Sequence, residues 1–294
     1  MRRSVAFFVA LAVPLLACSL LVDTTGLAGD GPAALDSGDE GQGPAADAAK
    51  DAAFDAHSST SAYRAAVLAD DPVAYFRLGD PSGATSVKNE VQTSGASGSL
   101  ANAPRLSVPG AIVGDLDTAI GFDTANGARL DLGTFLPRFD GLDASIELWF
   151  KRTVIPPDSA RFLFDRQTPA GLSGPRYALF LLNTRIHFER VGVDGGADVL
   201  YPGISIGLGS WYHVVVTTAA GGPVSIFVNG VVVGGTTTPA VVTPADLAGS
   251  LYFGTNVASL NSDAAAAIDE IAIYSKTLSA ARVLEHYRVG TTPP

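Results

Sequence analysis

The run "VSIFVNGVVVGG" constrains the fold of this chain more than any other part of the sequence. Two stretches rich in β-branched residues flank Asn229-Gly230, the residue pair that suits a type I′ turn because both positions take a positive φ. The run therefore predicts a tight antiparallel hairpin. Similar short runs, separated by turn residues, continue from Ala62 to the end of the chain, and no long amphipathic helical pattern interrupts them. This pattern predicts an all-β fold, an antiparallel two-sheet sandwich, rather than a parallel α/β sheet.

The strand predicted in "SIELWFKR" indicates how its two faces divide. Ile146, Leu148 and Phe150 recur at every second position, so they point to one face, which we expect to be the core. Trp149 is out of phase with them. We therefore expect its ring on the outer face of its sheet.

Two short helices are expected at the ends of the folded part. The stretch "SAYRAAVLADD" follows Ser61, and Pro72 would stop it. The stretch "SAARVLEHYRVG" has Ser279 as a good N-cap residue and Gly290 as an expected stop. We expect both helices to cover edges or ends of the sheets.

The first 18 residues have the features of an export signal. Two arginines precede an apolar run from Val5 to Leu16, which is too short to span a bilayer comfortably. The sequence "LLAC" then places a small residue before Cys18, the single cysteine of the chain. This resembles the lipobox of bacterial lipoproteins, which implies lipidation of Cys18 and a membrane-anchored, extracytoplasmic protein. Ser19 implies the outer membrane or cell surface by the same resemblance. The alternative is an ordinary secretory signal that contains Cys18 by chance.

Residues 19–61 are predicted to be a disordered tether. Eight acids against Lys50 give this segment a net charge of −7, out of −10 for the whole chain. Phe54 is its only aromatic residue, so it cannot bury enough apolar area to offset the entropy of ordering. We therefore expect one folded domain, over residues 62–294. An acidic chain without a basic block is not expected to bind nucleic acid.

Six motifs in the folded part point to a family by their order along the chain. They are "DPVAYFRLGDPSGAT", "TAIGFDTANGARLDLG", "ASIELWFKR", "GSWYHVVVT", "VSIFVNGVVV" and "IDEIAIYSKTLSAARVLEHY". Together they resemble a laminin-G-like jelly roll of the concanavalin A-like lectin/glucanase superfamily. The resemblance implies two antiparallel sheets packed face to face, one with a concave and one with a convex outer surface. It also implies a carbohydrate or protein ligand and, in many members, one calcium ion; related folds include glycoside hydrolases.

Two adjacent carboxylates, Asp269 and Glu270, lie inside the apolar run "AIDEIAIY". Neighbours in a regular strand point to opposite faces, so we expect these two to diverge. A glycoside hydrolase needs two carboxylates that flank one bond. The glucanases that this superfamily includes resemble E-x-D-x-E, whereas Ala267 stands here at the position of the first Glu. We therefore expect no catalytic pair, and we expect Glu270 to face solvent.

A structural calcium ion is the metal that the resemblance implies. It suggests Asp269 on a late strand as one ligand, with Asp80 in "RLGDPSG" and Asp123 in "GFDTANG" as neighbours. Carboxylate and carbonyl oxygens are the ligands that calcium prefers. The second loop is longer than the F-D-G turn of the family, which departs from its pattern. The alternative is that Asp269 accepts hydrogen bonds from local backbone amides.

Other site chemistries find no support in the sequence. The four histidines do not cluster at the spacing of a zinc site. No G-x-S-x-G nucleophile elbow is present, and the single thiol belongs to the predicted lipidation site. The Gly-rich stretches lack the Lys-Ser/Thr of a phosphate-binding loop and are typical of hairpin loops.

Aromatic residues are the side chains best suited to stack on the C–H face of a sugar. Trp149, Tyr177 and Tyr201 are the candidate ligand-binding residues, with Trp211 and Tyr212 as further aromatics. The alternative for each is that the ring fills the core. The sequence thus predicts a membrane-anchored binding module that is not an enzyme and that recognises carbohydrate or a surface protein. A glycoside hydrolase or lyase and a purely structural surface protein remain alternatives.

Overall fold

The computed structural model describes residues 61–91, 97–122, 126–134, 143–155, 159–167, 176–191, 197–219, 223–235, 249–256 and 263–293. Cys18, almost all of the predicted tether, and Asp123 lie outside these residues. No helix among them is long and apolar enough to cross a membrane.

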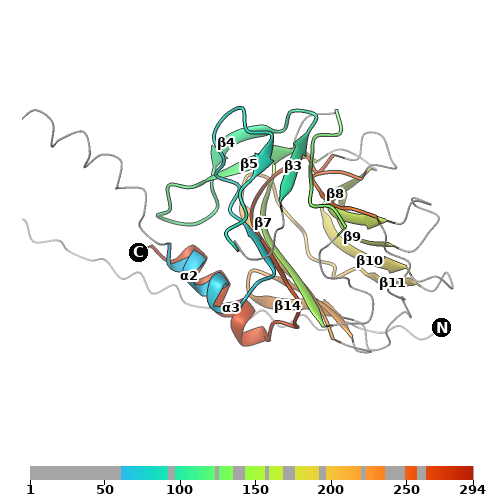
Figure 1. The fold of residues 1–294 in the computed structure, drawn as a ribbon. Coiled ribbons are helices and arrows are strands. Elements are labelled where there is room, and N and C mark those ends of the chain that lie inside the picture. Colours follow the sequence, from blue (N-terminus) through green and yellow to red (C-terminus); the bar gives the residue numbers. More distant parts are fainter. Residues whose placement is uncertain are drawn as a thin grey trace, which may run out of the picture. The chain divides into compact units, whose positions relative to one another are not determined.

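The described strands form two sheets, and every strand pairing in them is antiparallel (Figure 1). Sheet A runs in the order β14 (Val231–Gly235), β13 (Val224–Val228), β12 (Trp211–Thr218), β7 (Ala144–Arg152), β16 (Ala266–Tyr274), β5 (Thr118–Phe122), β4 (Arg105–Pro109), and β1 (Ala74–Phe76) also pairs with β16. Sheet B runs in the order β11 (Ala197–Leu200), β10 (Arg185–Val191), β9 (Arg176–Leu182), β8 (Ala160–Gln167), β15 (Leu251–Phe253), β6 (Arg129–Asp131), β3 (Gly98–Ala101), β2 (Ser86–Val87). The predicted all-β sandwich is confirmed.

The predicted hairpin joins β13 and β14. Asn229 has a φ of 52° and Gly230 a φ of 78°, the two positive values that a type I′ turn needs. The Asn229 side chain also accepts a hydrogen bond from the His213 amide at 3.0 Å, which fixes the turn against β12.

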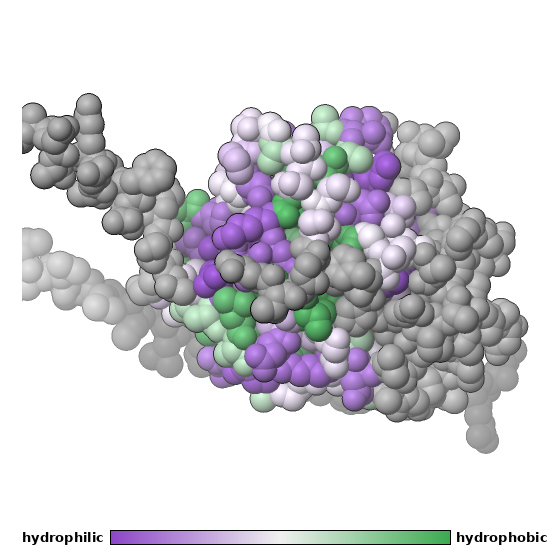
Figure 2. All heavy atoms as spheres, in the orientation of Figure 1, coloured by the Kyte–Doolittle hydropathy of each residue, from purple (hydrophilic) through white to green (hydrophobic). Residues whose placement is uncertain are grey.

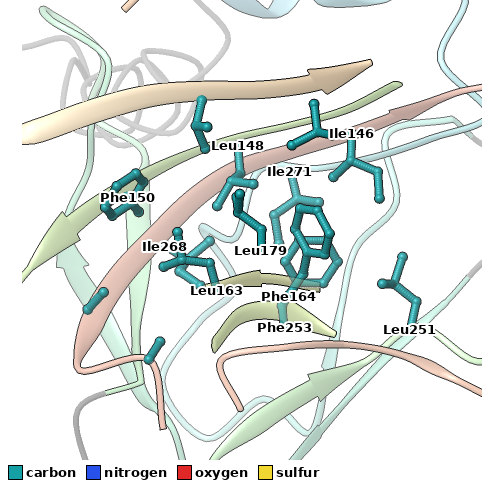
Figure 3. Packing of buried hydrophobic residues seen from close by; sticks show 14 of the residues in the cluster. Ile146, Leu148, Phe150, Leu163, Phe164, Leu179, Leu251, Phe253, Ile268 and Ile271 are labelled. Atoms are coloured by element: carbon teal, nitrogen blue, oxygen red, sulfur yellow. The ribbon is translucent and has the colours of Figure 1, made fainter. Parts of the chain in front are cut away.

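The core lies between the two sheets and contains the apolar side chains that point inward from the strands. Ile146, Leu148 and Phe150 of β7 are fully buried there, as the alternation predicted. Figure 3 shows these side chains together with Leu163 and Leu179 of sheet B in one packed cluster. Burial of these inward-facing apolar side chains is the main favourable contribution to folding.

Both described helices lie against sheet A. The helices α2 (Ala62–Ala69) and α3 (Ala280–Thr291) lie side by side (Figure 1). Ser279 caps α3 as predicted, because its hydroxyl accepts a hydrogen bond from the Arg282 amide at 3.3 Å. The expectation for Gly290 is wrong: the helix continues past it. A Cβ at Gly290 would lie 2.6 Å from the Trp149 ring, so this glycine allows the helix to approach the sheet.

Glu147 of β7 holds the helices to the sheet. Its carboxylate is fully buried and accepts hydrogen bonds of 2.8 Å from the hydroxyls of Tyr63 and Tyr274. His213 lies 2.8 Å and His286 lies 3.0 Å from its oxygens. Since Tyr63 belongs to α2 and His286 to α3, one carboxylate joins both helices to three strands.

Charge compensation makes this buried carboxylate stable. Burial alone would raise the pKa of Glu147, but the positive charge of His286 and the hydrogen bonds from His213 and His286 outweigh it and hold that pKa well below its usual value. Burial opposes the charge on His286, yet Glu147 and Asp70, the latter 3.0 Å from its Nε2, raise the pKa of that imidazole. Glu147 is therefore ionised at neutral pH, with His286 as its main counter-charge.

We expect Glu147→Ala to lower the free energy of unfolding by about 3–5 kcal/mol, because it leaves a buried imidazolium without its main counter-charge. Denaturant unfolding followed by circular dichroism measures this change. The matched control is Glu285→Ala, which removes an exposed glutamate from α3 and should stay within about 0.5 kcal/mol of wild type. Equal stability of the two variants would contradict the role given to Glu147.

Candidate functional site

The aromatic residues predicted to bind a ligand lie in three different environments. Trp149 is on the outer face of sheet A, as predicted, but it is only 1% exposed because Tyr63 of α2 and Tyr287 of α3 pack against its ring. Tyr177 is fully buried in the core between the sheets. Both expectations of ligand contact are wrong for this structure, since neither ring offers a free face. Tyr201, by contrast, is 63% exposed.

The two further aromatics are partly buried on β12. Tyr212 packs against the core and stacks on Phe150, and its hydroxyl accepts the Gly207 amide at 3.0 Å. Trp211 lies on the outer face of sheet A, where the Lys151 ammonium is 4.7 Å from the ring centroid. Both rings already have structural contacts.

The acid pair lies at a β-bulge. Glu270 has a φ of 52°, and the register of β16 against β7 shifts between Asp269 and Ala272. Ile268 and Ile271 both point into the core, so the two acids between them both leave on the outer side of sheet A. The expectation that the two carboxylates diverge is wrong, because an extra residue breaks the period of two.

The expectation that Glu270 faces solvent is also wrong: it and Asp269 are each 1% exposed. The Tyr75 hydroxyl donates to Glu270, and the Arg77 Nε lies 3.2 Å from its carboxylate. On one edge of β16, β5 pairs with the residues before the bulge and β1 pairs with those after it. Asp269 and Glu270 lie in the gap between these two strands. The two side chains fill this gap with polar contacts.

Burial raises the pKa values of both acids. Burial is the main cause for Glu270, and the opposing charge of Arg77 only partly offsets it, so the pKa of Glu270 rises to about 8. Burial and then the charge of Glu270 hold the pKa of Asp269 well above its usual value. The pair therefore retains a proton at neutral pH.

A cavity of about 480 Å³ lies close to the acid pair. Its charged lining residues are Arg77, Asp80, Lys88, Glu90, Asp115 and Asp117. The Arg77 guanidinium lies 2.6 Å from Asp115 and 3.0 Å from Asp117, which both line the cavity. It also lies 3.2 Å from Glu270. Neither Asp269 nor Glu270 is among the described residues that line the cavity. The acid pair is thus buried beside the cavity, whereas a glycoside hydrolase needs two carboxylates that flank the bond of a bound substrate.

Both carboxylate oxygens of Asp269 accept a hydrogen bond from the backbone. One Asp269 oxygen accepts the Ala111 amide at 2.7 Å and the other accepts the Glu270 amide at 3.0 Å. Asp80 accepts the Lys88 amide at 3.0 Å. Arg77 supplies the nearby positive charge, and the described residues contain no group of three or more potential ligands arranged to hold a metal. The local backbone hydrogen bonds of the alternative are present at Asp269, and the calcium ion stays a prediction.

Tyr201 ends a row of aromatic rings on the outer face of sheet B. The row runs across neighbouring strands: Phe162 is paired with Phe180, and Phe180 with His187. Phe188 pairs with Leu200, so the next residue along, Tyr201, lies beside His187. Ring centroids are 5.3 Å apart for Phe162 and Phe180, 5.2 Å for Phe180 and His187, and 4.7 Å for His187 and Tyr201. We call these four residues the aromatic row.

Of this row, only Tyr201, at its exposed end, was predicted from the sequence to bind a ligand. A period-of-two signal is present in "RYALFLL" and "RIHFERV", where Phe180 and His187 alternate with core residues. Phe162 has no such signal, because the register of β8 shifts between Phe162 and Phe164 and both Leu163 and Phe164 lie in the core. Their adjacency depends on strand register, which one sequence does not specify. Among the coloured residues in Figure 2, hydrophobic groups lie scattered between hydrophilic ones.

The raised pKa of Glu270 predicts a loss of stability as pH rises. Between its ordinary pKa and about 8, the folded state binds more protons than the unfolded state, so the free energy of unfolding falls with increasing pH in this window. Glu270→Gln removes the titrating group and the like charge beside Asp269. We expect the melting temperature of this variant to change less between pH 5 and pH 8 than that of wild type.

The matched control for this prediction is Glu90→Gln. The pKa of Glu90 is lowered by its contacts with Lys88 and Arg64 against the effect of burial, so it is already ionised across the window and its removal should leave the slope unchanged. Calorimetry measures the melting temperatures. If those of wild type and Glu270→Gln change by the same amount between pH 5 and pH 8, the raised pKa is wrongly assigned to Glu270.

Comparison with known proteins agrees with this fold. A laminin-G-type family model, described as the concanavalin A-like lectin/glucanases superfamily, matches residues 123–284. No curated protein matches the chain. The botulinum neurotoxin serotype D binding domain is 15% identical over 74% of this chain and 52% of its own, with a TM-score of 0.57.

Two further solved structures have the same fold. The serotype D ligand binding domain in complex with N-acetylneuraminic acid is 16% identical over 76% of this chain and 52% of its own, with a TM-score of 0.55. The binding domain of Paraclostridial Mosquitocidal Protein 1 is 13% identical over 74% of this chain and 52% of its own, with a TM-score of 0.56. The chain thus spans about half the length of these structures. The family match and the two-sheet sandwich together show that the chain belongs to the concanavalin A-like lectin/glucanases superfamily.

Proposed function

We propose that this chain is a non-catalytic module that binds carbohydrate on the outer face of sheet B. The observation that carries the proposal is Tyr201, a ring that is 63% exposed at the end of the aromatic row. An exposed aromatic ring backed by other rings is a rigid platform on which the apolar face of a sugar can stack.

The outer face of sheet A is covered by the helices around Trp149, which supports the outer face of sheet B as the binding face. Trp149 on sheet A lies under both helices, whereas Tyr201 on sheet B is open to solvent. The structures compared above are described as binding domains, and one of them holds N-acetylneuraminic acid. The superfamily also includes glucanases, but the buried acid pair at Asp269 and Glu270 argues against hydrolysis by this chain.

We further propose that the module is displayed outside the cytoplasm by a lipid at Cys18. Support comes from the apolar run before Cys18 and from the acidic, Gly- and Ala-rich segment after it, which suits a flexible spacer. Lasting attachment by lipid would need more than one acyl chain.

We expect Tyr201→Ala to weaken binding to glycans that the protein recognises by about tenfold or more, the loss typical of one aromatic anchor. A glycan array identifies these glycans, and calorimetric titration measures the change in Kd. Tyr201→Phe should retain most of the affinity, because it keeps the ring.

Trp211→Ala is the control, since it removes an aromatic residue from the outer face of sheet A and should leave Kd unchanged. Two results would contradict the proposal: no glycan binding by the folded protein, or release of reducing sugars from a polysaccharide.

A further inference from the structure

The strands of sheet B are positively charged in an otherwise acidic chain. They contain six arginines against four acids, a net charge of +2, whereas the whole chain carries −10. The arginines are Arg129, Arg161, Arg166, Arg176, Arg185 and Arg190. Arg166 and Arg190 are buried and the others except Arg185 are half-buried, so Arg185 is the exposed cation among these six.

Arg185 is the arginine placed to act together with the aromatic row. It lies two residues before His187 on β10, so both side chains leave the same outer face of sheet B. Ser205 forms an isolated bridge with Arg185, and Tyr201 lies in the same segment beside β10. The segment thus runs along Arg185 and His187 and brings a cation, an imidazole and an exposed ring to one place.

Arg185 and His187 both have unused hydrogen-bonding capacity. Arg185 is exposed, and no ion pair or hydrogen bond of its side chain is found within the described ranges. Arg176, on the next strand, instead pairs with Glu189 at 2.8 Å. His187 is 6% exposed, and its Nδ1 atom is buried without a hydrogen-bond partner.

A buried polar nitrogen without a partner is costly, so its presence between two rings calls for an explanation. The imidazole stacks on Phe180 at an interplanar angle of 10° and meets Tyr201 edge-on. Burial, together with the nearby charge of Arg185, lowers the pKa of His187. The imidazole is therefore neutral at pH 7 and packs as a flat, uncharged ring between Phe180 and Tyr201.

We propose that Arg185, His187 and Tyr201 form a subsite for a sugar that carries a carboxylate, such as a sialic or uronic acid. This inference rests on the proposed glycan-binding function and names the class of sugar. Tyr201 stacks on the apolar face of the sugar ring, His187 supports the Tyr201 ring from behind, and the guanidinium of Arg185 pairs with the carboxylate. An arginine fork matches a carboxylate in a bidentate manner, which gives selectivity over neutral sugars.

This subsite differs in charge from the cavity beside the acid pair. The charged lining of that cavity has more acids than bases, and Arg77 is already paired with Asp115 and Asp117. An anionic sugar would meet repulsion there. At the aromatic row, by contrast, the cation is exposed and has no acid paired with it among the described side chains.

The test compares matched sugars with matched variants of the intact protein. Calorimetric titration measures binding of sialyllactose against lactose, and of a glucuronic-acid-terminated disaccharide against its glucose-terminated counterpart. We expect tighter binding of at least one acidic member. Arg185→Gln should weaken that binding about tenfold or more and change the neutral member by less than about twofold, because only the carboxylate contact is lost. Tyr201→Ala should weaken both.

Arg288→Gln is the control, because it removes the same charge from an exposed position on α3 and should leave both affinities unchanged. Arg185→Lys should recover only part of the affinity, since an ammonium cannot form the bidentate pair. Binding of neutral sugars only, or an acidic preference that survives Arg185→Gln, would overturn this inference and leave the proposed function standing. Absence of binding to any glycan would overturn both.

Discussion

The burial of carboxylates on the outer face of sheet A is the constraint on which the rest of this structure depends. Glu147, Asp269 and Glu270 lie on that face with almost no exposure, and a buried charge is tolerated only with partners. The partners come from distant parts of the chain: Tyr63 and His286 reach Glu147 from the two helices, and Tyr75 reaches Glu270 from β1. Satisfying these groups therefore fixes both ends of the domain on one side of the sandwich.

This arrangement also determines which surface remains for recognition. Helices and buried polar contacts occupy the outer side of sheet A, while sheet B has the aromatic row and the exposed Arg185. The acid pair, which first suggested chemistry, has a structural role at the bulge where β5 gives way to β1. Stability and ligand binding are thus assigned to opposite faces of the same fold.

The sequence was sufficient for features that depend on local pattern. The alternation around Ile146 predicted the core face, Asn229-Gly230 predicted the hairpin, and Ser279 predicted the start of α3. The outer position of Trp149 followed from the same alternation. That α3 would cover this ring did not, because helix docking is a long-range contact made through Gly290.

The errors share one physical cause. The divergence expected of Asp269 and Glu270 assumed a regular strand, and a bulge depends on how β16 pairs with β7, which lies more than a hundred residues earlier in the chain. The same holds for the aromatic row, since Phe162, Phe180 and His187 become neighbours only once the register of three strands is set. A single sequence shows which residues alternate, but the pairing of strands decides which residues meet.

The central claim is that ligand binds on sheet B and not on sheet A. Amide chemical-shift mapping by NMR, with a glycan identified on an array, tests it most directly. The account predicts shifts concentrated in β9, β10 and residues 200–206, with β16, α2 and α3 unchanged. Shifts centred on residues 77–90 and 115–118 around the cavity, with none in β10, would contradict it.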